Sequence, residues 1–263
     1  MLKRRLIPVL FLKNGLIVRS QQFSYHQNLG NATSEVKRYS DWNVDELIYI
    51  DISKEKIYDL RRDDTCFKTR DNLIDIIHDV SKVSFMPLTF GGGIRTLDDI
   101  RMRLQHGADK VTINSIVFEN ESFVYESAKR FGAQCIIVSI DVKYIDGIPY
   151  VFKGGHEQTT LDPVEWAREV EKRGAGEIFL NSIDRDGMAE GYDCELIGRV
   201  TEAVNIPVIA CGGAADTYDF IELAKKTEVS AIAAGNMFHF TELSYPRAKN
   251  QLEKNNINVR IVA

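Results

Sequence analysis

The sequence lacks the features that mark several special classes of protein. Its four cysteines are far apart and form no CxxC pair, which argues against a disulfide framework or a zinc site and fits a reducing cytoplasm. The most apolar runs, at 6–12 and 135–140, are far shorter than the roughly 20 residues that a membrane-spanning helix needs. We therefore expect a cytoplasmic protein with no membrane span, no signal peptide, no metal and no cofactor.

Positive charge is also scarce, because 33 Lys and Arg face 38 Asp and Glu and the formal net charge is -5. No long basic run is present, so we expect no nucleic-acid partner. What remains is an ordinary globular composition, with 44% apolar and 27% charged residues. A length of 263 residues fits one large α/β domain or two small ones.

Short apolar runs typical of β-strands alternate with amphipathic helical segments along the whole chain. The clearest helix is 162–173, with Asp162 as its N-cap and Gly174 directly after it. The predicted strands are 6–12, 47–52, 86–90, 110–114, 135–141, 178–183, 207–211 and 229–234. Eight such units in 263 residues predict a (β/α)8 TIM barrel in one domain over 1–263, with an open doubly wound sheet as the alternative.

Two turns and one long loop interrupt this alternation. Asn14-Gly15 and Asp146-Gly147 are typical of type I′ hairpin turns, and both follow the carboxyl ends of predicted strands. The segment 53–70 is rich in Lys, Arg and Asp and is predicted to be a solvated loop. Barrel enzymes keep their sites at the face where these turns lie.

The chain also repeats itself. The matched segments are FGGGIRTLDDI at 90–100 with ACGGAADTYDF at 210–220, DELIYIDI at 45–52 with GEIFLNSI at 176–183, and LFLKNG at 10–15 with IDVKYIDG at 140–147. The offset is 120 for the first pair and near 130 for the other two. We therefore predict two duplicated half-barrels, with equivalent positions on either side of a pseudo-twofold axis.

Glycines follow two of the predicted strands and lead into helical segments. These glycines lie at 91–93 and 212–213. The neighbouring predicted strands lead into Asn114-Ser115 and Ala234-Gly235. Glycine lets backbone N–H groups approach an anion closely, and the start of a helix adds a favourable dipole. These positions predict two phosphate cradles on opposite sides of the barrel mouth, although each glycine pair could also be a simple turn.

Carboxylates stand at strand ends between the two cradles. Asp141 ends the strand 135–141, and Asp184 and Asp186 follow the strand 178–183. A carboxylate at this end of a barrel strand is typical of catalysis or ligand binding, and capping of the next loop is the alternative. The equivalent of Asp141 in the other half is Phe11, which can neither accept nor donate a proton.

Several of these segments together resemble one family, the cyclase subunit of imidazole glycerol phosphate synthase. The segments are RLIPVLFLKNG, DELIYIDI, FGGGIRT, GADKVTINS, SIDVK, VEWAREVEKRGAGEI, NSIDRDGMAEGYD, VIACGGA and FHF. The resemblance implies a (β/α)8 barrel whose top face joins ammonia to a bisphosphorylated precursor and closes an imidazole ring. It also implies a glutaminase subunit docked on the amino-terminal face of the barrel, with ammonia passing through the interior.

The resemblance also implies roles for individual residues. The phosphate contacts fall on Gly92, Gly93, Asn114 and Ser115 at one end and on Asp186, Gly187, Gly213, Ala234 and Gly235 at the other. The ammonia gate falls on Arg5, Glu46, Lys110 and Glu177, for which a structural salt-bridge cluster is the alternative. Of the family's two essential aspartates, Asp141 is kept as the catalytic residue and Phe11 replaces the other. Arg19 stands where the family has a loop lysine.

This exchange of one aspartate for Phe11 favours a changed role, because removing a general acid or base costs roughly 10²- to 10⁴-fold in rate. The main hypothesis is a barrel that conducts ammonia from a glutaminase partner for amidination of an acetamido sugar, as in the surface-polysaccharide paralogues that the sequence resembles. A phosphorylated small molecule or an acceptor enzyme would then lie at the opposite face.

Two alternatives remain open. One is an authentic cyclase subunit of histidine biosynthesis, a lyase, in which Asp184 or Asp51 replaces the lost carboxylate. The other is a non-catalytic scaffold that activates the glutaminase.

Overall fold

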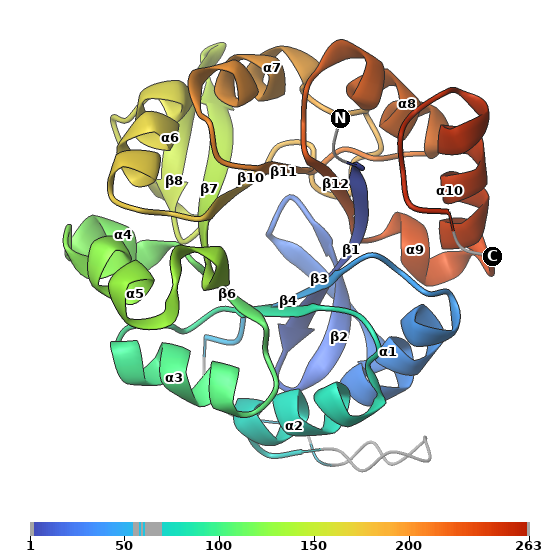
Figure 1. Ribbon diagram of the computed structural model, residues 1–263, viewed down its shortest axis with the longest axis horizontal. Helices are drawn as coiled ribbons and strands as arrows, with labels where there is room; N and C mark the ends of the chain where they lie inside the picture. Colours follow the sequence, from blue (N-terminus) through green and yellow to red (C-terminus); the bar gives the residue numbers. More distant parts are fainter. Residues whose placement is uncertain (1–2, 55–57, 59, 61–69, 262–263) are drawn as a thin grey trace.

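The computed structural model describes residues 3–54, 58, 60 and 70–261, and its central strands form a closed barrel (Figure 1). The barrel strands are β1 (Arg5–Lys13), β4 (Leu47–Asp51), β5 (Leu88–Gly91), β6 (Lys110–Ile113), β7 (Ile136–Ile145), β10 (Glu177–Ser182), β11 (Val208–Cys211) and β12 (Ala231–Ala234). Each pairs in parallel with the next, and β12 pairs with β1 to close the ring. The predicted (β/α)8 barrel is confirmed.

Helices cover the outside of the barrel (Figure 1). They are α1 (Ala32–Asp41), α2 (Leu73–Val83), α3 (Leu97–Gln105), α4 (Ser115–Glu119), α5 (Phe123–Phe131), the short 3-10 helix η1 (Ala133–Cys135), α6 (Pro163–Lys172), α7 (Cys194–Ala203), α8 (Thr217–Lys226), α9 (Met237–Phe240) and α10 (Ser244–Lys254). Helix α6 begins as predicted, because the Asp162 side chain accepts hydrogen bonds from the backbone N–H groups of Val164 and Glu165. No helix within the described ranges is long and apolar enough to cross a bilayer.

Two hairpins extend the carboxyl ends of β1 and β7. The added strands are β2 (Leu16–Gln21) and β3 (Tyr25–Asn31) after β1, and β8 (Ile148–Lys153) and β9 (Glu157–Gln158) after β7. Asn14 and Gly15 have φ of 53° and 82°, and Asp146 and Gly147 have φ of 50° and 78°. Two consecutive positive φ angles define the type I′ turn, so both predicted hairpins are confirmed.

One expectation near the first hairpin is wrong. Arg19 was expected in a loop but lies within β2, opposite Gln27 of β3. The alternating segment after the Asn14-Gly15 turn simply continues as a strand. Most of the predicted loop 53–70 lies outside the described residues.

Alternate residues of the barrel strands fill two separate layers of core. In β1, Ile7, Val9 and Phe11 belong to a layer inside the barrel. Leu10 and Leu12 belong to the layer between strands and helices. The inner layer is a packed apolar cluster, as is usual for a barrel of this size.

The strand register supports the predicted duplication. Phe11 of β1 lies opposite Ile50 of β4, and Asp141 of β7 lies opposite Asn181 of β10. Each of these pairs sits beside the start of a hairpin, since Phe11 also pairs with β2 and Asp141 with β8. Phe11 and Asp141 therefore occupy equivalent places in the two halves.

Candidate functional site

A cavity of about 330 Å³ opens at the carboxyl-terminal mouth of the barrel. It is lined by Phe11, Lys13, Asn14, Ser20, Phe23, His26, Ile52, Lys54, Gly154, Gly155 and His156. The lining combines the basic side chains of Lys13 and Lys54 with the apolar side chains of Phe11, Phe23 and Ile52, and it includes no carboxylate. The cavity is therefore suited to an anionic ligand that also presents an apolar face.

Asp141 is buried beside this cavity among neutral hydrogen-bond donors. Its Oδ1 accepts from Ser139 Oγ at 3.2 Å and from Asn181 Nδ2 at 3.3 Å, and its Oδ2 accepts from Asn114 Nδ2 at 2.9 Å. Burial raises the pKa of Asp141 to about 6, although the bonds from Asn181 and Ser139 oppose the rise; the negative charge of Asp186 adds to it. A carboxyl group with this pKa can exchange a proton near neutral pH.

Phe11 fills the equivalent place in the other half. Its ring is 6% exposed and meets the ring of Phe23 edge-on, with 5.7 Å between the centroids. Asp51 does not replace the missing carboxylate, because it lies opposite Leu12, whose side chain belongs to the outer layer. Asp184 is engaged elsewhere, since its Oδ2 accepts the backbone N–H of Tyr144 at 2.7 Å.

The first predicted cradle lies at the ends of β5 and β6. A Cβ atom at Gly92 would lie 2.0 Å from the Asp51 carbonyl oxygen, so only glycine fits at this position. The side-chain amide of Asn114 is engaged within the protein: Nδ2 donates to Asp141, and Oδ1 accepts the Gly154 N–H at 2.7 Å. Ser115 follows as the first residue of α4.

The second predicted cradle lies at the ends of β10, β11 and β12, and the β2–β3 hairpin folds against it. The cradle consists of Asp186, Gly187, Gly213, Ala234 and Gly235. Asp186 Oδ2 accepts from Ser20 Oγ at 2.6 Å and from the Phe23 N–H at 3.3 Å. Burial raises the pKa of Asp186, and these two hydrogen bonds oppose the rise.

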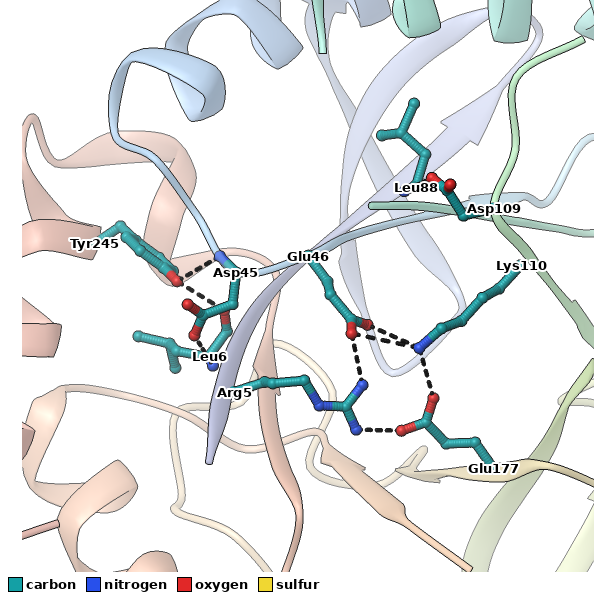
Figure 2. Close-up of polar contacts among 9 residues, drawn as sticks. All are labelled: Arg5, Leu6, Asp45, Glu46, Leu88, Asp109, Lys110, Glu177 and Tyr245. Atoms are coloured by element: carbon teal, nitrogen blue, oxygen red, sulfur yellow. Dashed lines mark hydrogen bonds and ion pairs between the residues drawn. The ribbon is translucent and has the colours of Figure 1, made fainter. Parts of the chain in front are cut away.

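Four alternating charges meet at the amino-terminal end of the barrel (Figure 2). Arg5 donates to Glu46 Oε1 at 2.7 Å and also pairs with Glu177. Lys110 Nζ lies 3.3 Å from Glu46 and 3.1 Å from Glu177. Burial alone would lower the pKa of Arg5, but the two carboxylates outweigh it and hold that pKa above its ordinary value. The predicted residues thus form a closed ring of ion pairs.

Several contacts at the mouth were not found from the sequence. Ser139 and Asn181 hold Asp141, and Ser20 holds Asp186. The available signal was weak: Ser139 and Asn181 are polar residues inside otherwise apolar strands, facing the same side as Asp141. The contact of Ser20 with Asp186 joins segments 166 residues apart, which no local pattern predicts.

Comparison with known proteins agrees with the geometry of the barrel. The sequence model of the family described as histidine biosynthesis protein matches residues 5–244. A protein of Hydrogenobaculum sp. named imidazole glycerol phosphate synthase subunit HisF is 44% identical over 263 residues, covering 99% of this chain and 100% of the relative. A protein of Alkaliphilus metalliredigens with the same name is 39% identical, again covering 99% of this chain and 100% of the relative. The chain belongs to the histidine biosynthesis protein family, among its HisF-type barrels.

Proposed function

We propose that this chain is the ring-closing subunit of an imidazole glycerol phosphate synthase and works with a glutaminase subunit. Relatives at 38–44% identity that are named imidazole glycerol phosphate synthase subunit HisF favour this function over the sugar-amidination hypothesis. The observation that carries the proposal is Asp141, a buried carboxyl group with a pKa of about 6 at the barrel mouth. Such a group can act as a general acid or base on a ligand held there.

The two glycine-rich cradles hold the ligand by its phosphate groups in this proposal. Gly92, Gly93, Asn114 and Ser115 bind one phosphate, and Asp186, Gly187, Gly213, Ala234 and Gly235 enclose the other. Backbone N–H groups are the donors at the first end, since the Asn114 side chain is already bonded to Asp141 and Gly154. The same bond keeps Asp141 oriented next to the ligand.

The charged ring is the inlet for ammonia from the glutaminase, which docks on the amino-terminal face. Arg5 and Lys110 are paired with Glu46 and Glu177, so the charges of the ring balance one another and no carboxylate of the ring is left without a cation to attract ammonium. Beyond the ring the barrel interior is apolar, with Ile7, Val9 and Ile48 in its packed layer. Side-chain movement within this layer would let ammonia pass.

A second candidate function is favoured by one observation, the aromatic ring of Phe11 in place of a carboxylate. In that case ammonia is delivered to a different acceptor, such as an acetamido sugar, or the barrel only activates the glutaminase. A single carboxylate cannot divide acid and base work with a partner, so ring closure by the native chain should be slow.

Ammonia-dependent turnover of the ribulosyl bisphosphate precursor tests these candidates. We expect slow turnover by the native chain, none by Asp141→Asn, and a gain of roughly 10²- to 10⁴-fold for Phe11→Asp. Phe11→Leu is the matched control, because it also removes the aromatic ring from the barrel mouth but adds no carboxylate. Absence of turnover in both the native chain and Phe11→Asp would reject the ring-closing function and leave the second candidate.

A further inference from the structure

Arg103 is a buried cation directly behind the first cradle. It lies on α3 and is only 5% exposed. Its guanidinium donates through Nη1 to the Asp99 carbonyl oxygen at 2.9 Å and through Nη2 to the Gly92 carbonyl oxygen at 2.7 Å. Its Nε is buried and has no hydrogen-bond partner within the described part of the chain.

The guanidinium of Arg103 has no direct ion-pair partner among the residues that the structure describes. Among residues 3–54, 58, 60 and 70–261, no carboxylate is within ion-pair distance of its guanidinium. Burial lowers the pKa of Arg103, and the more distant carboxylates of Asp99 and Asp51 offset this only in part. Burying a charge without a direct partner costs stability, so we expect Arg103 to have a function at the Gly92-Gly93 segment that it contacts.

The bond to Gly92 determines which way the next N–H points. In a trans peptide the C=O of one residue and the N–H of the next point in opposite directions, and the described chain has no cis peptide bond. With the Gly92 carbonyl held toward Arg103, the Gly93 N–H faces away from it. No hydrogen bond to this N–H is present among the described residues. A Cβ atom at Gly93 would meet only Arg103 Nη2, at 3.9 Å, so space around this residue is open.

The other half of the barrel supplies an internal comparison. The offset of 120 residues that relates Gly92 to Gly212 also relates Arg103 to Leu223 on α8. Leu223 is fully buried and has no charge or donor in its side chain. The two cradles thus differ at this equivalent position, because Arg103 can donate to the Gly92 carbonyl and Leu223 cannot donate at all. The cation nearest the second cradle, Arg185, donates instead to the Gly191 carbonyl oxygen at 3.0 Å.

We propose that Arg103 is a positioning residue of the first cradle, which holds the Gly92-Gly93 peptide so that its N–H faces a phosphate group. Its buried positive charge also favours a phosphate dianion at this cradle. The inference rests on the phosphate-binding part of the proposed function and does not require ring closure.

Binding of inorganic phosphate to the full chain tests this role, measured by ³¹P NMR titration and by the phosphate-dependent rise in Tm. Arg103→Leu copies the residue of the other half and should weaken phosphate binding roughly 10-fold or more, since hydrogen bonds to charged groups have about this effect. Arg103→Lys keeps the charge and should retain part of the affinity. Arg101→Leu, on the exposed side of the same helix beside Asp98, is the matched control and should bind as the native chain does.

The outcomes separate this inference from the proposed function. The positioning role would be overturned if Arg103→Leu bound phosphate as tightly as the native chain. It would also be overturned if the native chain bound no phosphate. A loss of binding in Arg103→Leu without any ring-closing turnover would support the role and reject the ring-closing function. If Arg103→Leu does not fold, the comparison of Arg103→Lys with Arg101→Leu decides, and equal affinity in these two variants would overturn the inference.

Discussion

The two halves of the barrel share the order of their barrel strands and the place of their hairpins but differ in the side chains at the mouth. Phe11 in the first half corresponds to Asp141 in the second, and Arg103 corresponds to Leu223. The first half thus has the buried cation behind its cradle, whereas the second half has the carboxylate. The repeated strands determine where side chains can be placed, and the chemistry comes from how the halves differ.

The largest effect on stability should come from the carboxyl group that only the second half has. The folded pKa of Asp141, about 6, lies above its ordinary value of 3.8, so folding favours the protonated form. This contribution is fully present below pH 4 and is lost as the pH rises through about 6. Asp141→Asn resembles the protonated form and should therefore raise the free energy of unfolding at pH 7 by roughly 3 kcal/mol and change little at pH 4. Urea unfolding across this range measures it, and a difference independent of pH would contradict the burial argument.

A smaller effect on the free energy of unfolding is expected at the charged ring, where the two halves have the same residue type. Glu46 and Glu177 are equivalent residues by the repeat, and each contacts both Arg5 and Lys110. Glu46→Gln and Glu177→Gln should each lower the free energy of unfolding by about 1–3 kcal/mol, and by similar amounts, because each leaves the same two cations short of one partner. Chemical denaturation measures both.

The control for the ring is Glu222→Gln on α8, which removes an exposed ion pair with Lys226 and should cost about 0.5 kcal/mol or less. Clearly unequal losses for Glu46→Gln and Glu177→Gln would show that the ring is not symmetric in energy.

The smallest effect concerns the helices that follow the two cradles. Both α3 and α8 begin with a capping box, formed by Thr96 with Asp99 and by Asp216 with Asp219. Thr96→Ala and Asp216→Ala should each cost about 1 kcal/mol in thermal unfolding. Ser122→Ala at the start of α5 is the comparison, since the Ser122 side chain makes no cap bond and its hydroxyl donates to the side chains of Asn120 and Glu126, which are exposed contacts of lower expected cost. A loss confined to one half would mean that these helix starts are not equivalent.

The fold could be predicted from the sequence because its signals are local. Apolar runs marked the eight barrel strands, and Asp162 and Gly174 marked the ends of α6. The four residues of the ring at the amino-terminal end were named through the family resemblance, and the structure brings them together; Arg5, Lys110 and Glu177 are the first residues of their strands.

Contacts between distant segments could not be predicted in this way. The hydrogen bond from the Asn114 amide to Asp141 was not anticipated, because it depends on where β6 ends relative to β7. Arg103 lies in the polar segment LDDIRMRLQ, which suggests an exposed surface. Only the docking of α3 on the barrel buries its guanidinium against Gly92.

The β2–β3 hairpin has a consequence for the second half of the repeat. It belongs to the first half, yet Ser20 and Phe23 bond to Asp186, and the Ser20 carbonyl oxygen accepts from Asn236 Nδ2 at 2.7 Å. A second half produced alone would therefore lose the donors that Ser20 and Phe23 supply to Asp186. The second cradle is completed by residues of both halves, although its glycines all come from one.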